Sequence, residues 1–236
     1  LEYGDYAITE AGFGADLGAE KFYNIKCRKT GLQPDLTVLV VTLQALKMHG
    51  GVAQEDIKKP NIEGMKNGYW NLDKHVKNLQ SFGQTVVIAF NKFATDTDEE
   101  IEVLRQHCEE MGCGFAVNNA FAEGGKGAVE LANLVVKTID EHPSAPLYFA
   151  YKDDEPVEKK IEDVAFNLYG AGSVTMSDSA KAMIEEIKKL GAEKFPICIA
   201  KTQYSFSTDA KAYGPTEGFE LHVRDITVNM GAEMIV

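Results

Sequence analysis

The sequence predicts an α/β fold in which mostly parallel sheets are flanked by helices. Apolar runs of four to six residues alternate with segments of helical periodicity through most of the chain. These short runs have no polar face, which is typical of parallel strands that are buried on both sides. Residues that commonly start or end helices, among them Thr97 and Gly191, stand between the runs. These three observations together indicate parallel strands joined by helices.

Apolar runs mark the candidate strands. They cover residues 36–41, 85–90, 114–118, 147–151, 173–176 and 196–200. The last forty residues differ, because apolar and polar residues alternate in AKTQYSFS and in FELHVRDITVNM. Such alternation favours antiparallel or edge strands.

Segments with apolar residues three or four positions apart mark the candidate helices, because this spacing places the apolar side chains on one face. They cover residues 98–111, 127–140, 157–168 and 178–190. Thr97 followed by Asp98, Glu99 and Glu100 predicts the start of the first of these helices, and Ser177 that of the last. Gly112 and Gly191 are placed to end helices.

The net charge and the spacing of the cysteines limit the kinds of partner and site that the chain is expected to have. With 24 Lys and Arg against 36 Asp and Glu, the net charge of −12 disfavours binding to nucleic acid or to an anionic membrane. The longest apolar run, LTVLVVTLQAL, is too short to span a bilayer. The four cysteines are scattered without metal-ligand spacing, which predicts reduced thiols in a cytoplasmic protein and no metal site on the chain.

A glycine-rich loop (residues 12–18) precedes a segment rich in Ala, Leu, Glu and Lys that predicts a helix directly after it. The dinucleotide fingerprint G-x-G-x-x-G does not fit, because Gly12, Gly14 and Gly18 are spaced one residue too widely. The phosphate loop G-x-x-x-x-G-K-[ST] is absent from the sequence. Backbone N–H groups of the loop and Lys21 nevertheless suit an anion, so Gly12, Gly14 and Lys21 are candidate cofactor-binding residues. Phe13 is either a buried apolar plug or a lid over a ligand.

Five motifs in this order give the chain a family resemblance. They are TEAGFGADLGAEKF (9–22), ALKMHGG (45–51), NKFATDTDEE (91–100), FAEGGKG (121–127) and AKTQYSFS (200–207). Over its whole length the chain resembles formate–tetrahydrofolate ligase. This resemblance implies that ATP phosphorylates formate and that the amine of tetrahydrofolate attacks the resulting formyl phosphate. It also implies ATP, magnesium and a monovalent cation as cofactors, and a cytoplasmic homotetramer.

The resemblance assigns roles to three aromatic residues. Phe93 and Phe121 correspond to the two aromatic side chains that sandwich the pterin ring in the family, where many members have Trp at the second position. Phe13 corresponds to a loop Phe close to the formyl phosphate and folate, which makes it the candidate catalytic residue. Lys201 and Tyr204 are either site-adjacent or subunit-contact residues, and His49 is expected to cap the end of a helix, with a catalytic role as the alternative.

The resemblance also predicts a domain organisation. Residues 1–75 are expected to be the remaining part of a P-loop nucleotide-binding domain, and residues 76–236 a folate-binding α/β domain truncated at its C-terminal end. The chain is therefore expected to be a middle-to-late part of the ligase. The alternative is a non-catalytic folate-binding or regulatory module without a P-loop.

Overall fold

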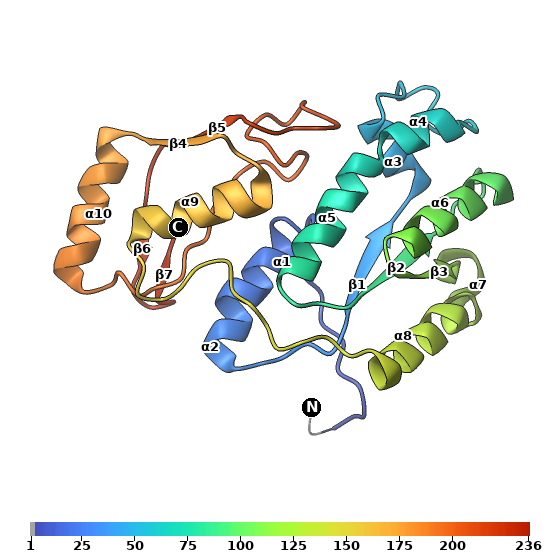
Figure 1. Cartoon of the computed structure of the whole chain (residues 1–236), viewed down its shortest axis with the longest axis horizontal. Helices are drawn as coiled ribbons and strands as arrows, with labels where there is room; N and C mark the ends of the chain where they lie inside the picture. Colours follow the sequence, from blue (N-terminus) through green and yellow to red (C-terminus); the bar gives the residue numbers. More distant parts are fainter. Residues whose placement is uncertain (1–2) are drawn as a thin grey trace.

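A parallel sheet forms the centre of the first half of the chain. The computed structural model describes residues 3–236. Its main sheet has three parallel strands in the order β1-β2-β3, which are β1 (Thr37–Val41), β2 (Val86–Asn91) and β3 (Gly114–Asn118) (Figure 1). The predicted α/β class and these three predicted strands are confirmed.

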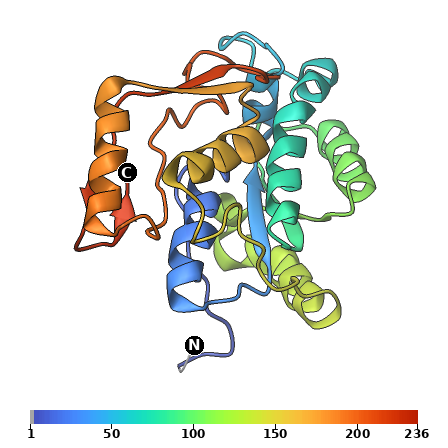
Figure 2. The same cartoon turned by 60° about the vertical axis from the view of Figure 1, so that its left-hand side comes forward.

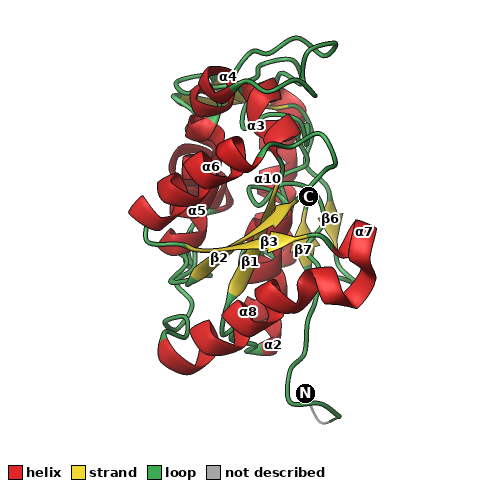
Figure 3. Cartoon of the chain, turned by 90° about the vertical axis from the view of Figure 1, so that its right-hand side faces the viewer, coloured by secondary structure: helices red, strands yellow, loops and turns green. Residues whose placement is uncertain are grey.

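Helices cover both faces of this sheet. The helices of this half of the chain are α3 (Leu43–His49), α4 (Ile62–Asn67), α5 (Tyr69–Ser81), α6 (Asp98–Glu110), α7 (Ala120–Glu123) and α8 (Val129–Glu141), of which α5, α6 and α8 pack on the strands. In Figure 3, α5 and α6 lie on one side of the sheet and α8 on the other. Because β2 is central and covered on both faces, its five residues from Val86 to Phe90 are all buried. The sequence analysis did not single out α4 and α5.

The second half of the chain holds two small sheets. After α9 (Val157–Val164) and a π-helical turn (Ala165–Tyr169), β4 (Ser173–Met176) pairs in parallel with β5 (Glu220–Val223). The short strands β6 (Val228–Asn229) and β7 (Met234–Ile235) form an antiparallel pair. Figures 1 and 2 both show β4 and β5 near one end of α10 (Asp178–Leu190) and β6 and β7 near the other.

The start of the described chain is helical after the glycine loop. A short α1 (Gly18–Lys21) continues through a π-helical segment (Phe22–Cys27) into α2 (Arg28–Thr30). Gly31 then ends this helical run in the left-handed conformation, with a φ of 69°. The prediction of a helix directly after the glycine loop is confirmed.

Two predicted strands are wrong. Residues 147–151 form no strand, because their backbone groups bond to side chains elsewhere: Ala150 N donates to Asn24 Oδ1, and Tyr151 O accepts from Arg28 Nη2. In residues 196–200 only a single bridge forms, between Ile197 and Ile235. Of the antiparallel or edge strands expected in the last forty residues, β6 and β7 are antiparallel and β5 is an edge strand in a two-stranded parallel sheet, whereas AKTQYSFS forms no strand.

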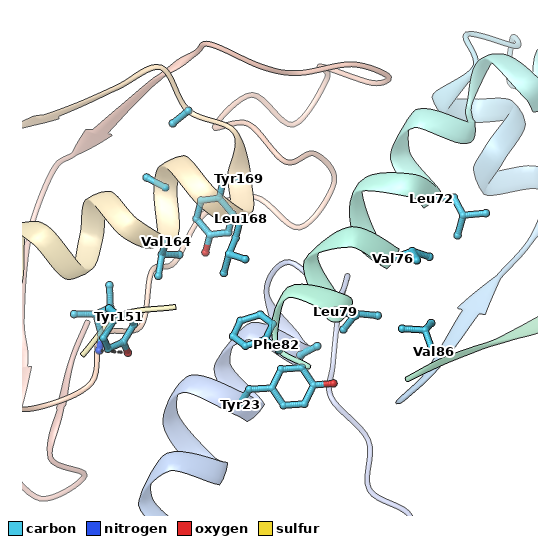
Figure 4. Close-up of a cluster of buried hydrophobic side chains, with 14 of the residues drawn as sticks. Tyr23, Leu72, Val76, Leu79, Phe82, Val86, Tyr151, Val164, Leu168 and Tyr169 are labelled. Carbon is cyan, nitrogen blue, oxygen red and sulfur yellow. Dashed lines mark hydrogen bonds between the residues drawn. The ribbon is translucent and has the colours of Figure 1, made fainter. Parts of the chain in front are cut away.

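One apolar core runs through both halves of the molecule. Figure 4 shows Leu72, Val76 and Leu79 on α5, with Val164, Leu168 and Tyr169 across from its lower end and Phe82 and Tyr23 between them. A buried hydrogen bond of 2.8 Å from Asn78 Nδ2 to Leu168 O joins α5 to the turn after α9. The proposed domain boundary between residues 75 and 76 falls within α5, and the division into two domains stays a prediction.

Among residues 3–236, no helix combines the length and the apolar character needed to cross a membrane.

Candidate functional site

The two aromatic residues Phe93 and Phe121 follow neighbouring strands at the same edge of the main sheet. Phe93 comes two residues after the end of β2, and Phe121 three residues after the end of β3. The Phe93 side chain is 44% exposed and the Phe121 side chain is fully exposed. In open α/β sheets, ligands bind beyond the carboxyl ends of parallel strands, and this is where both rings lie. The edge is therefore the first candidate for a ligand site.

Hydrogen bonds at the strand ends link the two turns. Asn118 Nδ2 donates to Asn91 Oδ1 across the ladder at 2.8 Å, and Lys92 N donates to Asn118 O at 3.1 Å. Asn118 Oδ1 also accepts from Ala120 N, at the start of α7. Both turns are thus built on one pair of asparagines, and their relative placement is fixed by the sheet.

The turn that carries Phe93 is closed by its own side chains. Asp96 Oδ2 accepts from Phe93 N at 2.8 Å. Burial raises the pKa of this carboxyl, although the Phe93 N–H opposes the shift. The predicted start of α6 is confirmed, because Thr97 and Glu100 form a reciprocal capping box. Phe93 therefore sits on a short turn that is held at both ends.

A buried ion pair ties this turn to α3. Lys47 Nζ lies 2.6 Å from Glu100 Oε1, and both side chains are nearly inaccessible to water. Lys47 Nζ also donates to Lys59 O, and Asn61 N donates to Glu100 Oε1. Burial alone would raise the pKa of Glu100, but the hydrogen bonds from Lys47, Asn61 and Thr97 outweigh it and hold this pKa below its usual value. The pair fixes the N-terminus of α6 and so supports the Phe93 turn.

The glycine-rich segment after Phe121 folds back onto the start of α7. Asn119 N donates to Gly127 O at 2.9 Å. A Cβ atom at Gly127 would lie only 2.4 Å from Asn119 O, so the close approach requires glycine at this position. The FAEGGKG motif therefore shapes the loop that presents the Phe121 ring to solvent.

The glycine loop of residues 12–18 exposes Phe13. The Phe13 side chain is 77% exposed, so it is not the buried plug that the sequence left open. Its φ of 64° lies in the left-handed region, which a side chain of this size rarely adopts. A Cβ atom at Gly18 would lie 1.9 Å from Gly12 O, so glycine at position 18 allows the loop to close on itself.

Lys21, at the end of the short helix α1 that follows this loop, already forms an ion pair. Lys21 Nζ lies 3.1 Å from Glu20 Oε2, and the Glu20 carboxylate also accepts from Asn24 Nδ2. Burial raises the pKa of Glu20, and Lys21 opposes this shift. Lys21 also lines a shallow hollow of about 340 Å³ together with Glu10, Phe22 and Cys198. The Lys21 charge is thus shared with a buried carboxylate, and cofactor binding by Gly12, Gly14 and Lys21 stays a prediction.

The structure brings together some of the predicted residues. Phe93 and Phe121 lie on adjacent turns, whereas Gly12, Phe13 and Gly14 belong to a separate loop that packs on α5 through His75. Within the described chain, none of the three phenylalanine rings stacks on another aromatic ring. Stacking on another aromatic side chain of the described residues therefore does not occupy these rings.

Three site-adjacent polar residues went unassigned in the sequence analysis. His75 lies under Gly14, and its ring contacts Phe206 at 4.5 Å between centroids. Asp16 and Lys201 form a buried ion pair beside it. The AKTQYSFS motif drew attention to Lys201. The sequence did not indicate its ion-pair partner, because Asp16 lies 185 residues away.

We predict that His75 makes the folded chain sensitive to mild acid. Burial lowers the pKa of His75 to about 4 from a usual value of 6.5. Between these two values the unfolded chain binds the proton and the folded chain does not, so acidification favours unfolding. At about 1.4 kcal/mol per unit, the free energy of unfolding should fall by about 3 kcal/mol from pH 6.5 to pH 4 through this group.

Urea denaturation of the chain at a series of pH values measures this loss. His75→Gln should reduce the pH dependence in this range, whereas the exposed His142→Gln should leave it unchanged. An identical pH dependence in the chain and in His75→Gln would contradict the assignment.

The chain is similar to known proteins over its whole length. A family model described as formate–tetrahydrofolate ligase matches residues 1–236. The chain is 65% identical over its full length to the formate–tetrahydrofolate ligase of Bacteroides fragilis, 64% to that of Bacteroides thetaiotaomicron and 47% to that of Campylobacter curvus. It spans about 42% of the length of the two Bacteroides relatives and 43% of the third. The chain therefore belongs to the formate–tetrahydrofolate ligase family.

Proposed function

We propose that this chain supplies the folate-binding part of an ATP-dependent ligase that joins formate to tetrahydrofolate through formyl phosphate. The observation that carries the proposal is the pair of exposed rings, Phe93 and Phe121, on adjacent turns beyond β2 and β3. Two flat apolar faces suit a fused aromatic ring system such as pterin, which gains by stacking and by leaving water. The substrates formate and tetrahydrofolate are those for which the related ligases are named.

The chain's own residues bind and orient in this proposal. Phe93 and Phe121 hold the pterin ring between them, and this fixes the direction in which the folate amine points. Holding a nucleophile close to an acyl phosphate turns an encounter between two molecules into a step within one complex. Phe13, exposed at the tip of the glycine loop, covers the reacting groups and excludes water from the formyl phosphate.

The residues described here do not form a complete site for ATP and magnesium. The sequence contains no G-x-x-x-x-G-K-[ST], and within residues 3–236 no group of three or more His, Cys, Asp and Glu side chains is placed to hold a metal ion. Lys21 is paired with Glu20. We therefore derive no step through the nucleotide, magnesium or the monovalent cation. By resemblance, we propose that the assembled enzyme is a cytoplasmic homotetramer.

A hybrid ligase tests the proposed function. In this hybrid, the chain replaces the matching segment of the Bacteroides fragilis relative, to which it is 65% identical. We expect formyl-tetrahydrofolate to form only when ATP, magnesium, formate and tetrahydrofolate are all present. A hybrid that binds tetrahydrofolate without turnover would instead favour the non-catalytic folate-binding module. A hybrid that does not bind it would contradict both functions.

We predict that the 236-residue polypeptide alone does not make formyl-tetrahydrofolate. The reason is the missing phosphate loop, whose lysine and backbone N–H groups position the phosphates in phosphoryl transfer. A coupled assay with all four components should stay at background, while the hybrid assayed in parallel should turn over. Comparable turnover by the polypeptide and the hybrid would contradict the prediction.

A further inference from the structure

A buried ion pair connects two segments from opposite ends of the chain. Lys201 Nζ lies 2.7 Å from Asp16 Oδ2, and the two side chains are only 3% and 5% exposed. Lys201 Nζ also donates to Ser205 O at 2.6 Å and to Thr202 O at 3.2 Å, so the ammonium group has three oxygen partners. A charge removed from water in this way is stable only while its partners stay in place. The pair therefore locks the geometry of both segments.

The locked segments are the glycine loop of residues 12–18 and the polar segment of residues 201–207. The Lys201 ammonium lies 4.8 Å from the centre of the Tyr169 ring, which is completely buried. On the same side, Phe206 packs against both His75 and Trp70 of α5. The glycine loop thus packs against a surface made by α5, Tyr169 and the polar segment. The Asp16 carboxylate joins the loop to this surface through its ion pair with Lys201.

Phe13 combines an exposed side chain with a strained backbone. Its side chain is 77% exposed while its backbone stays in the left-handed region at a φ of 64°. A non-glycine residue keeps such a conformation only where the surrounding structure imposes it. The N–H groups of Leu17 and Gly18 donate to Gly14 O and close the loop, and Asp16 lies inside this closed turn. The anchor of the strained loop is therefore the Asp16 carboxylate.

We propose that Asp16 and Lys201 are positioning residues that hold Phe13 over the reacting groups of the ligase. This inference rests on the proposed function, because it deepens the role given there to Phe13. Asp16 and Lys201 are buried and act through the loop, without touching a substrate. The pair thereby couples the polar segment to the glycine loop.

Kinetics of the hybrid ligase test this positioning role. Asp16→Asn and Lys201→Met should each lower kcat at least tenfold while the KM for tetrahydrofolate changes less than threefold, because Phe93 and Phe121 belong to other turns. In a Phe13→Ala background the same substitutions should lower kcat little further, since the side chain that they position is already gone. Full additivity with Phe13→Ala, or an unchanged kcat in Asp16→Asn, would overturn the inference.

The Lys47–Glu100 pair offers a matched control, because it is equally buried but supports the Phe93 turn. Lys47→Met should raise the KM for tetrahydrofolate, and its effect should add to that of Phe13→Ala. If Lys47→Met instead reproduces the kinetic pattern of Lys201→Met, the losses report general destabilisation, and the positioning role is overturned.

Hydrogen exchange gives a readout that does not depend on turnover. Asp16→Asn and Lys201→Met should speed amide exchange in residues 12–18, and Lys47→Met should not. If amides 12–18 of both variants are protected from exchange as strongly as in the unsubstituted hybrid, the ion pair does not anchor the glycine loop and the inference is overturned. A hybrid with no ligase activity before any substitution contradicts the proposed function and the catalytic part of this inference. An active hybrid whose Asp16→Asn variant keeps its kcat contradicts the inference alone.

Discussion

Replacing Phe93 or Phe121 by Ala in the hybrid ligase should weaken tetrahydrofolate binding about five- to a hundredfold. Each ring supplies one stacking face, which is worth roughly 1–3 kcal/mol by analogy with bases stacked on aromatic side chains. A loss of 1.4 kcal/mol corresponds to a factor of ten in the dissociation constant. Isothermal titration calorimetry with tetrahydrofolate measures the change directly. Phe121→Trp should be tolerated or bind slightly more tightly, because the indole ring adds stacking area.

A matched control separates stacking from a general effect of removing an exposed ring. Phe166 is 39% exposed, close to the 44% of Phe93, but it lies in the π-helical turn after α9. Phe166→Ala should bind tetrahydrofolate normally, and the affinity for ATP should be unchanged in all three alanine variants. Normal tetrahydrofolate binding by both Phe93→Ala and Phe121→Ala would show that the site assignment is wrong even though the family is correct.

Breaking the buried pair of Lys47 and Glu100 should strongly destabilise the folded chain. Lys47→Met leaves the Glu100 carboxylate buried without its cation, and such losses amount to about 3–5 kcal/mol. Chemical denaturation of the chain measures the change in the free energy of unfolding. The double variant Lys47→Met/Glu100→Gln should recover part of the loss, because no uncompensated charge remains.

An exposed lysine provides the comparison for this experiment. Lys59 pairs with Asp56 at 2.6 Å, but its side chain is 72% exposed. Lys59→Met should cost no more than about 1 kcal/mol, as is usual for surface ion pairs. If Lys47→Met and Lys59→Met destabilise the chain equally, the buried pair does not anchor the start of α6.

Local patterns were sufficient to predict much of the main sheet and its helices. The run at β2 is apolar because both faces of that strand are covered, and the cap at Thr97 is readable because all its partners lie within three residues. Residues 147–151 show the limit of this reasoning. Their apolar run resembles a strand, yet the backbone groups of Ala150 and Tyr151 find their hydrogen-bond partners at Asn24 and Arg28. Periodicity carries no information on such distant partners.

The candidate site was likewise predictable only in part, namely where its residues follow local patterns or family motifs. The ends of β2 and β3 placed Phe93 and Phe121 at one edge of the sheet, and the family resemblance gave these residues a role. The buried pairs that support the site could not be predicted, because Asp16 and Lys201 stand 185 residues apart in the sequence. A charged residue in a sequence is usually solvated, and only the folded chain shows that these side chains are buried and paired.

The most direct measurement is a crystal structure of the hybrid ligase with tetrahydrofolate bound. We expect the pterin ring to lie between Phe93 and Phe121, with the two phenyl rings about 7 Å apart, which is twice the usual stacking distance. A pterin ring bound elsewhere, or phenyl rings that face separate surfaces when the ligand is present, would contradict the proposed folate site.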